Sequence, residues 1–474
     1  MDDGDLRRVG GTLRAFHRRF APLFGRRETR RRSGQYLRGL LVQQTDRRNA
    51  ENLAEAVAGA SPRALQRFLT ESPWADAPVR VALQEYLGER LLPVAPGQGL
   101  ATDGVHLVDD TGFAKQGRHS VGVARQYSGT LGRVANCQVG VFLGYATAGG
   151  HALTEAALYL PRVWTGEPAR CRRAGVPEAV LARGYQSKAE LALALLRRTR
   201  AVGVLVGRWV TADAGYGAVP TFRDALDADG WWYVLEVPRT TPVFARPART
   251  RRVRLTPGAP SRPVTILPAA QTVQAWAATR SPRQWRTVTV AAGVQGPRTY
   301  QYTAARVWEG RDDQPGRRTW LLVRRHLDGS GLKYAFSNAP PETPLHDLAR
   351  VGATRWPIET EFQQGKGEVG LDAYEVRSWR GWHHHVTLAL LAGAFLLTLE
   401  QDWGGKGRRG RATPPRPTRP RPARHPPADH PAAAPSAPPP PLDASRPVPL
   451  AGQHPAAQCL RLRRPRQTPA LNPL

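Results

Sequence analysis

Acidic and basic side chains recur at helical spacings over residues 355–366, Arg-Trp-Pro-Ile-Glu-Thr-Glu-Phe-Gln-Gln-Gly-Lys. Pro357 favours a helix start here, because its fixed φ suits the first turn and its missing N–H is not needed there. From that start, Glu359, Phe362 and Lys366 fall at i, i+3 and i+7, so they project from one face. The sequence therefore predicts a helix with a carboxylate and an ammonium group on one side. A solvated Glu/Lys face is the alternative, and acidic residues elsewhere must decide between the two.

Two further acidic sites lie upstream, each directly after a short apolar segment that reads as a strand. The first is Asp109 with Asp110, and the second is Asp213. Cleavage and transfer of phosphodiesters commonly use two divalent cations about 3.5–4 Å apart. Mg²⁺ accepts a few carboxylate oxygens that come from distant parts of a chain. Asp109 or Asp110, Asp213 and Glu359 would meet that need, although a turn or helix-cap role is the alternative for each aspartate.

The charge balance indicates a polyanionic partner, and nucleic acid is the commonest one. The formal charge is +30 and the isoelectric point is near 11.3. The last 71 residues hold 19 prolines and contribute +11, so +19 remains on residues 1–403. Membrane surface is the competing partner, but the longest apolar run, 386–399, is shorter than the roughly 20 residues that span a bilayer. We therefore expect that run to form a buried core helix and expect no membrane association.

The elements that must position these residues fall into five segments of an α/β chain. Residues 1–98 read as a basic helical domain that would bind DNA, with a merely solvated helical bundle as the alternative. Residues 99–238 read as three antiparallel strands followed by helix–strand alternation, which is an α/β mixture. Residues 239–318 read as a β-rich insertion, and residues 319–403 return to the core with the glutamate helix. Residues 404–474 are predicted to be disordered, because their composition cannot offset chain entropy. Three widely separated cysteines indicate neither a disulfide framework nor a zinc site, and a reducing cytoplasm fits them best.

Motifs of four kinds resemble, in order, the DDE transposases of bacterial insertion sequences. They are Asp-Asp-Thr-Gly at 109–112, Ala-Asp-Ala-Gly-Tyr at 212–216, Arg355-x3-Glu359-x6-Lys366, and the stretches 121–132 and 370–385. The third motif is similar to the Tyr-x2-Arg-x3-Glu-x6-Lys signature of one group. Gly352 stands where that signature has tyrosine, so any contact made by that ring is absent here or comes from elsewhere. The resemblance runs over roughly residues 12–400.

The resemblance implies an RNase H-like mixed sheet flanked by helices, with a β-strand insertion before the glutamate. It matches Asp213 and Glu359 with the second and third metal ligands, and Arg355 and Lys366 with DNA-contacting residues. Asp109 is favoured over Asp110 as the first ligand. Two Mg²⁺ ions, or Mn²⁺ in their place, would serve end cleavage and strand transfer without a covalent enzyme–DNA intermediate. The implied protein is cytoplasmic, nucleoid-associated and bacterial.

The implied partners are double-stranded DNA, as transposon ends and as target, and further copies of the chain in a synaptic complex. Additional DNA contacts are expected from a glycine-spaced basic segment, for which a screened surface patch is the alternative. We expect DNA binding at Lys115, Arg118, Arg125, Arg133 and Arg377.

Some conspicuous residues have plainer interpretations. Glu361 faces away from Glu359, so we expect it to be solvated or salt-bridged. Consecutive histidines on a helix point in different directions, so the run 383–385 is expected to pack or contact DNA rather than bind a metal. Two other functions remain open: an RNase H-like nuclease or resolvase, and a non-catalytic or decayed DNA-binding remnant of a transposase.

Overall fold

Helices build the N-terminal segment, as the sequence predicts. Pro62 directly follows Ser61 and starts α4, whose Leu65, Phe68 and Leu69 are buried at helical spacing against the neighbouring helices. Asn49 caps α3 by accepting a hydrogen bond from the backbone N–H of Asn52 at 3.0 Å. The helices are α1 (Asp3–Phe20), α2 (Arg27–Val42), α3 (Ala50–Ala56), α4 (Pro62–Thr70) and α5 (Asp76–Leu91), with the 3-10 helix η1 (Ala21–Phe24) between α1 and α2.

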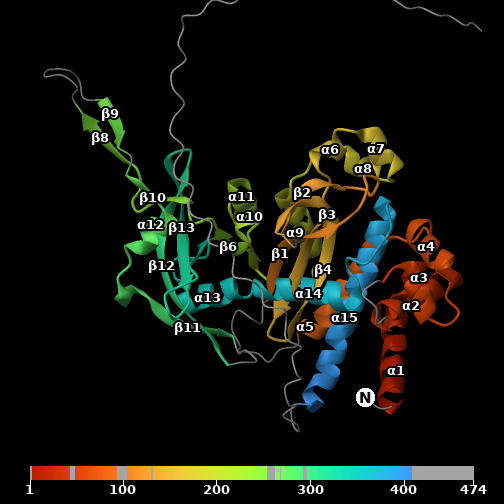
Figure 1. Ribbon diagram of the computed structural model, residues 1–474. Coiled ribbons are helices and arrows are strands. Elements are labelled where there is room, and N and C mark those ends of the chain that lie inside the picture. The colour runs from red at the N-terminus through yellow and green to blue at the C-terminus, as the bar shows by residue number, and fades with distance from the viewer. Residues whose placement is uncertain are drawn as a thin grey trace, which may run out of the picture. The chain divides into compact units, whose positions relative to one another are not determined.

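The computed structural model (Figure 1) describes residues 3–42, 48–92, 104–129, 132–253, 262–266, 268–291 and 296–407. Most of the predicted tail, from 408 onward, lies outside these residues, whereas 404–407 continue the last helix, α15 (Trp379–Gly407).

Five strands form the sheet that carries the acidic residues, in the order β4-β3-β1-β5-β6. The first three strands along the chain that take part, β1, β3 and β4, pair antiparallel, whereas β1, β5 and β6 pair parallel through helical crossovers. This order and mixture of directions is the RNase H-like arrangement, so the predicted fold class is confirmed. The strands are β1 (Val105–Ala114), β3 (Arg133–Thr147), β4 (Gly150–Leu158), β5 (Trp209–Ala212) and β6 (Trp232–Val237).

Short elements connect these strands. The capping box of Ser187 and Glu190 starts α9, and Gly203 in a left-handed conformation ends it. One strand, β2, lies inside the glycine-spaced basic segment and was not predicted; it pairs with β3. The connecting elements are β2 (Ala124–Ser128), α6 (Arg162–Thr165), α7 (Pro168–Arg173), α8 (Glu178–Leu181), α9 (Lys188–Val202), α10 (Ala214–Gly217) and α11 (Pro220–Ala228).

The β-rich insertion and the strands that return from it to the core extend the same sheet instead of forming a separate one. β14 pairs antiparallel with β6, β13 with β14, and β12 with β13, which brings the sheet to 12 strands. β8 and β9 form a separate hairpin. The elements are β7 (Pro242–Phe244), β8 (Arg249–Val253), β9 (Arg262–Ile266), β10 (Ala270–Thr272), α12 (Val273–Ala278), η4 (Pro282–Gln284), β11 (Arg286–Ala291), β12 (Arg298–Arg311), β13 (Gln314–Arg325) and β14 (Lys333–Ser337).

Helices cover both faces of the sheet. On one face, α13 (Leu345–Ala353), α14 (Trp356–Val369) and α15 pack on the strands (Figure 1), and Leu107, Leu322 and Ile358 belong to one buried cluster there. On the other face, α9, α11 and α12 cover a second cluster that includes Val108, Leu321 and Val323. Residues 107 and 108, and likewise 321 and 322, therefore alternate between the two layers, as strand geometry requires.

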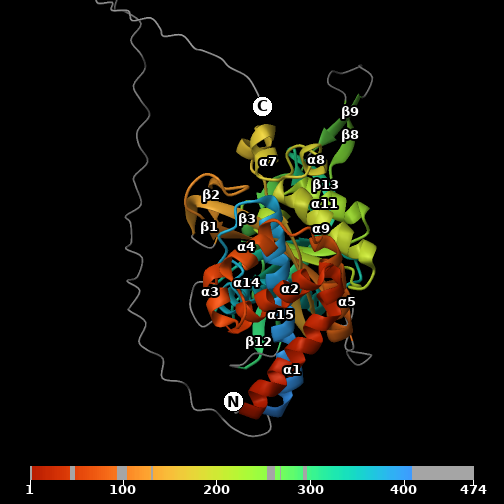
Figure 2. The ribbon, with the colours of Figure 1, turned by 90° about the vertical axis from the view of Figure 1, so that its right-hand side faces the viewer.

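Helix α15 lies between the sheet and the N-terminal helices (Figures 1 and 2) and contacts β4, α2, α4 and α5. The segment Trp379–Trp403 is long and apolar enough to cross a membrane, but 83% of its most apolar window is buried inside the protein. This burial confirms the prediction of a core helix for residues 386–399.

Candidate functional site

Strand geometry separates the two aspartates of β1. Asp109 has the same parity as Leu107 and faces α14, whereas Asp110 faces the layer that contains α9. Lys188 of α9 donates to Asp110 at 2.9 Å, and the hydroxyl of Tyr216 donates to it at 3.2 Å. Asp110 is thus neutralised on its own side of the sheet.

Asp213 lies beside Asp109 because β1 and β5 run parallel. Their register pairs Val108 with Ala212, so the two aspartates follow a paired position at the same sheet edge. Asp213 is also the N-cap of α10, and its Oδ1 accepts hydrogen bonds from the backbone N–H groups of Gly215 at 2.9 Å and Tyr216 at 3.3 Å. Asp213 is therefore a helix cap, as the alternative interpretation of its sequence position held. Both capping hydrogen bonds use Oδ1, so Oδ2 takes no part in them.

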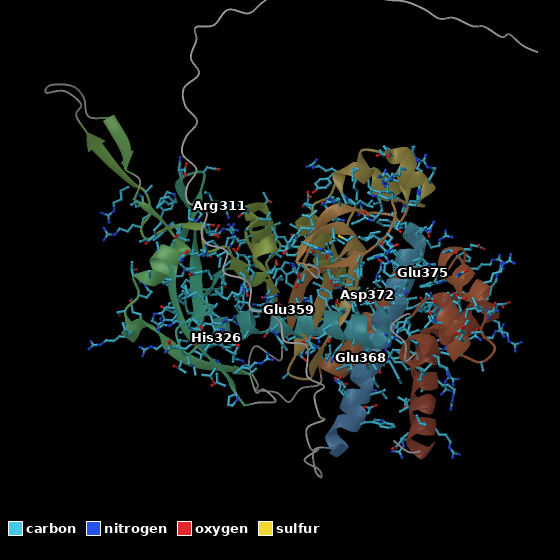
Figure 3. The ribbon with its side chains drawn as sticks, in the orientation of Figure 1. Arg311, His326, Glu359, Glu368, Asp372 and Glu375 are labelled. Carbon is cyan, nitrogen blue, oxygen red and sulfur yellow. The ribbon has the colours of Figure 1, made fainter. Side chains whose placement is uncertain are left out.

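Arg355 joins the remaining carboxylates to this pair. It stands at the start of α14, with its guanidinium 2.5 Å from Glu359, 3.3 Å from Glu236 and 3.8 Å from Asp109. Its side chain is only 13% exposed, whereas that of Glu359 is 48% exposed. Glu359 lies near the N-terminal end of α14 (Figure 3), where its i, i+4 spacing from Arg355 allows the contact. One arginine therefore holds carboxylates from β1, β6 and α14.

Burial and mutual repulsion shift the acidic groups of this cluster. Burial, together with the negative charge of Asp213, raises the pKa of Asp109 to about 7. Burial also raises the pKa of Asp213, and the charge of Asp110 adds to that rise. Closely spaced carboxylates that repel one another favour a cation among them.

Glu236 is the site residue that was missed in the sequence. It follows Leu235, which pairs with Ala212 in the parallel register of β5 and β6, so it neighbours Asp213. It contacts both Arg355 and Lys333, the latter at 3.4 Å. The only signal was a lone carboxylate within the apolar run Trp-Trp-Tyr-Val-Leu-Glu-Val, at a position equivalent to Asp213 one strand over.

Lys366 occupies the same face of α14 as Glu359, as the helical spacing predicts. Its ammonium group donates to the hydroxyl of Thr111 at 2.8 Å and to the carbonyl of Gly112 at 3.2 Å, and burial lowers its pKa. Thr111 lies two residues after Asp109 on β1. Lys366 is therefore anchored to the strand that carries Asp109.

The other predicted DNA contacts do not gather at this cluster. Lys115 is turned toward Tyr374, with its ammonium group 2.8 Å from the carbonyl oxygen and 3.4 Å from the ring centroid, and burial lowers its pKa to about 8. The four arginines have exposed side chains, and Arg118 accepts a hydrogen bond from Arg170 through its backbone carbonyl only. They are Arg118, Arg125, Arg133 and Arg377.

The plainer residues pack as expected. His384 stacks on Trp74 with ring centroids 3.7 Å apart, and His385 is hydrogen-bonded to the Tyr36 hydroxyl at 2.8 Å. Glu361 contacts His151 at 2.6 Å, away from the acidic cluster. The histidine run is therefore part of the packing between α15 and the N-terminal helices.

Residues 19–297 match the family described as DDE superfamily endonuclease. The chain belongs to this family. No curated protein matches it. The match to this DDE superfamily endonuclease family includes Asp109 and Asp213 and ends before α14, so it does not cover Glu359.

The donor set of this DDE superfamily endonuclease fits a hard divalent cation. Carboxylate oxygens are the ligands that Mg²⁺ prefers. Burial and the like charge of Asp213 raise the pKa of Asp109, and a bound cation would relieve the repulsion between the two carboxylates. Among the described residues no group of three His, Cys, Asp or Glu side chains is arranged to hold a metal ion. At this site, Glu359 forms an ion pair with Arg355.

Proposed function

We propose that the chain is a transposase that cuts the ends of an insertion sequence and joins them to target DNA. Asp109, Asp213 and Glu359 would hold two Mg²⁺ ions, or Mn²⁺ in their place. The observation that carries this proposal is the Arg355 cluster, in which carboxylates from β1 and α14 meet beside Asp213 in a DDE superfamily endonuclease.

The bound cations would activate the attacking oxygen and stabilise the leaving oxygen of a phosphodiester. The chain's own residues have the complementary task of positioning. Arg355 can present two N–H groups to a phosphate once DNA competes with Glu359 for it, since guanidinium and phosphate match in a bidentate pair. Lys366 supplies a point charge next to β1. Glu236 would keep Arg355 at the site when Glu359 leaves it.

Asp109 is the better candidate for the first ligand. It faces Arg355 and α14, whereas Asp110 is bonded to Lys188 and Tyr216 on the other side of the sheet. A carboxylate that already has an ammonium partner binds a metal less readily, because the metal must displace that partner.

DNA binding is proposed for the helical segment 1–98 and for the exposed arginines outside the acidic cluster, and assembly into a homo-oligomeric synaptic complex is proposed with it. The support is the charge of +19 on residues 1–403. Lys115 fits this role less well than Arg118, Arg125, Arg133 and Arg377, since its ammonium group is committed to Tyr374.

The test is cleavage and joining of the cognate element ends by the purified chain in Mg²⁺. We expect Asp213→Asn and Glu359→Gln to abolish cleavage while end binding remains. Glu368→Gln is the matched control, because Glu368 lies exposed on the same helix (Figure 3) and should leave cleavage unchanged. Undiminished cutting by either site variant would remove that residue from the site. Cleavage without joining would indicate a nuclease or resolvase, and no cleavage by the parent chain would indicate a binding remnant.

A further inference from the structure

A groove in the β-rich insertion is lined by arginines. Its volume is about 430 Å³, and it lies between η4 with the start of β11 on one side and strands β12 and β13 on the other. We call it the arginine groove and define it by Arg280, Arg283, Arg286, Thr303, Trp320 and Leu345. No acidic side chain belongs to the lining. This distinguishes the groove from the acidic cluster around Arg355.

Aromatic rings, and not carboxylates, lie against three arginines in and beside the groove. The guanidinium of Arg280 lies 4.3 Å from the ring centroid of Trp276. Arg306 pairs across the strands with Trp320, and Arg318 with Trp308, at 5.5 Å and 5.1 Å from the ring centroids. Within the described part of the chain, neither these three arginines nor Arg283 and Arg286 form an ion pair. Their positive charges therefore face the groove and its rim without neutralisation.

Arg306 is fixed in place by backbone carbonyls. It donates to the carbonyl of Ala339 at 3.0 Å and to that of Arg318 at 3.2 Å. Burial lowers its pKa, and the nearby charge of Arg318 lowers it further. The guanidinium of Arg306 is thus fixed in position near a second positive charge, and an anionic ligand would offset the repulsion between the two.

The groove opens on the face of the sheet that also carries the acidic cluster. Tyr302 and Leu322, from the strands that border it, share a buried cluster with Ile358 of α14. At the beginning of β12, the guanidinium of Arg298 lies 4.1 Å from the ring centroid of Trp356, the residue after Arg355. A DNA segment in the acidic cluster could therefore continue along this face toward the groove.

We infer that the arginine groove binds the sugar–phosphate backbone of double-stranded DNA outside the phosphodiester that reacts. This inference rests on the proposed function and deepens it, because it assigns a second contact region for the same substrate. Guanidinium groups without acidic partners attract phosphates and release the counterions of the duplex, independent of base sequence. The duplex can be the transposon end or the target, and both present the same phosphate chemistry.

The test is the salt dependence of DNA binding by an R283Q/R286Q double variant. Both side chains are exposed, so the fold should survive, and thermal unfolding checks this. The matched control, R172Q/R197Q, removes the same charge at two exposed arginines that are paired with Glu178 and Asp229. Binding is measured by fluorescence anisotropy in the absence of divalent cations. The first experiment uses the element-end duplex, and the second adds an unrelated duplex to protein that has already bound the element end.

We expect the slope of log affinity against log salt to fall by about two for the groove variant, one for each lost phosphate contact, and to stay unchanged for the control. A smaller slope with the end duplex assigns the groove to the transposon end. A smaller slope only with the second duplex assigns it to target DNA. An unchanged slope with both duplexes, or an equal loss in the control, overturns the inference. Because the assay needs no cleavage, its outcome is separate from the test of the catalytic carboxylates.

Discussion

Arg317 and Arg318 are neighbours on β13 with opposite electrostatic surroundings. Arg317 forms ion pairs with Asp224 at 3.2 Å and with Asp227 at 2.9 Å. Arg318 points to the other face, where it lies over Trp308 and pairs with no carboxylate of the described residues. At this point of β13, the arginine on one face is thus paired with carboxylates, and the arginine on the other face is not. The neutralised face is built for stability, and the charged face is suited to an anionic ligand.

The same contrast separates the two aspartates of β1. Asp110 forms an ion pair with Lys188 at 2.9 Å. Asp109 lies beside the like charge of Asp213, and its contact with Arg355 is longer, at 3.8 Å. In both places, a group without a full partner marks a surface for a ligand of opposite charge. The predictions below test whether this distinction between neutralised and unneutralised groups holds.

The largest expected effect is the difference between Asp109→Asn and Asp110→Asn. Loss of Asp109 should abolish Mg²⁺-dependent end cleavage, because it removes the proposed first metal ligand. Loss of Asp110 should leave measurable cleavage, reduced by about 10–100-fold, as is typical of residues that only support a metal site. Single-turnover cleavage measures both. The reverse order of activities would make Asp110 the ligand.

On the neutralised face, Glu309→Gln should destabilise the fold. Glu309 is fully buried and contacts Arg223 at 3.0 Å and Arg311 at 2.7 Å. Removing its charge leaves Arg223, which is only 3% exposed, with an uncompensated buried charge, at a cost of about 3–5 kcal/mol. Urea unfolding measures this change. Arg318→Gln, the control on the charged face, should change the free energy of unfolding by less than about 0.5 kcal/mol.

The smallest expected effect is a pH dependence of stability in the metal-free protein. The pKa of Asp109 is about 7 in the folded state and is raised above its unfolded value of 3.8. Between pH 3.8 and pH 7, the folded protein therefore keeps a proton on Asp109 that the unfolded chain has lost. As a result, the free energy of unfolding decreases as the pH rises through this range. The slope is at most about 1.4 kcal/mol per pH unit.

Unfolding in a chelator at pH 5 and pH 8 measures this dependence. The parent chain should lose more stability between the two pH values than Asp109→Asn, which cannot titrate. Equal losses of stability in the two proteins would show that the pKa of Asp109 is not raised in the folded state.

The order of helices and strands in the core could be predicted well from the sequence, and the pairing of the strands less well. Alternating apolar residues and strand-end aspartates located β1 and β5, and the proline of residues 355–366 located α14. β2 was missed because its five residues, Ala-Arg-Gln-Tyr-Ser, show no clear alternation of apolar and polar side chains. That the insertion would extend the sheet through β14 and β6 could not be predicted, since pairing between distant strands is decided by tertiary contacts that leave no local pattern.

The candidate site shows the same limit. Spacing placed Glu359 and Lys366 on one face, but it gave no sign that Arg355 also contacts Glu236 of β6. Glu236 carried no strand-end signal and became visible only through its parallel neighbour Asp213. Partners that depend on three elements meeting cannot be read from any one of them.

The most direct measurement of the central claim is anomalous diffraction from crystals of the chain with its element end and Mn²⁺. We predict manganese bound by the carboxylates of Asp109, Asp213 and Glu359, with Glu359 released from Arg355 and Arg355 moved onto a DNA phosphate. Manganese bound elsewhere on the DNA-loaded protein, or Glu359 still paired with Arg355 beside an empty pair of aspartates, would contradict the account.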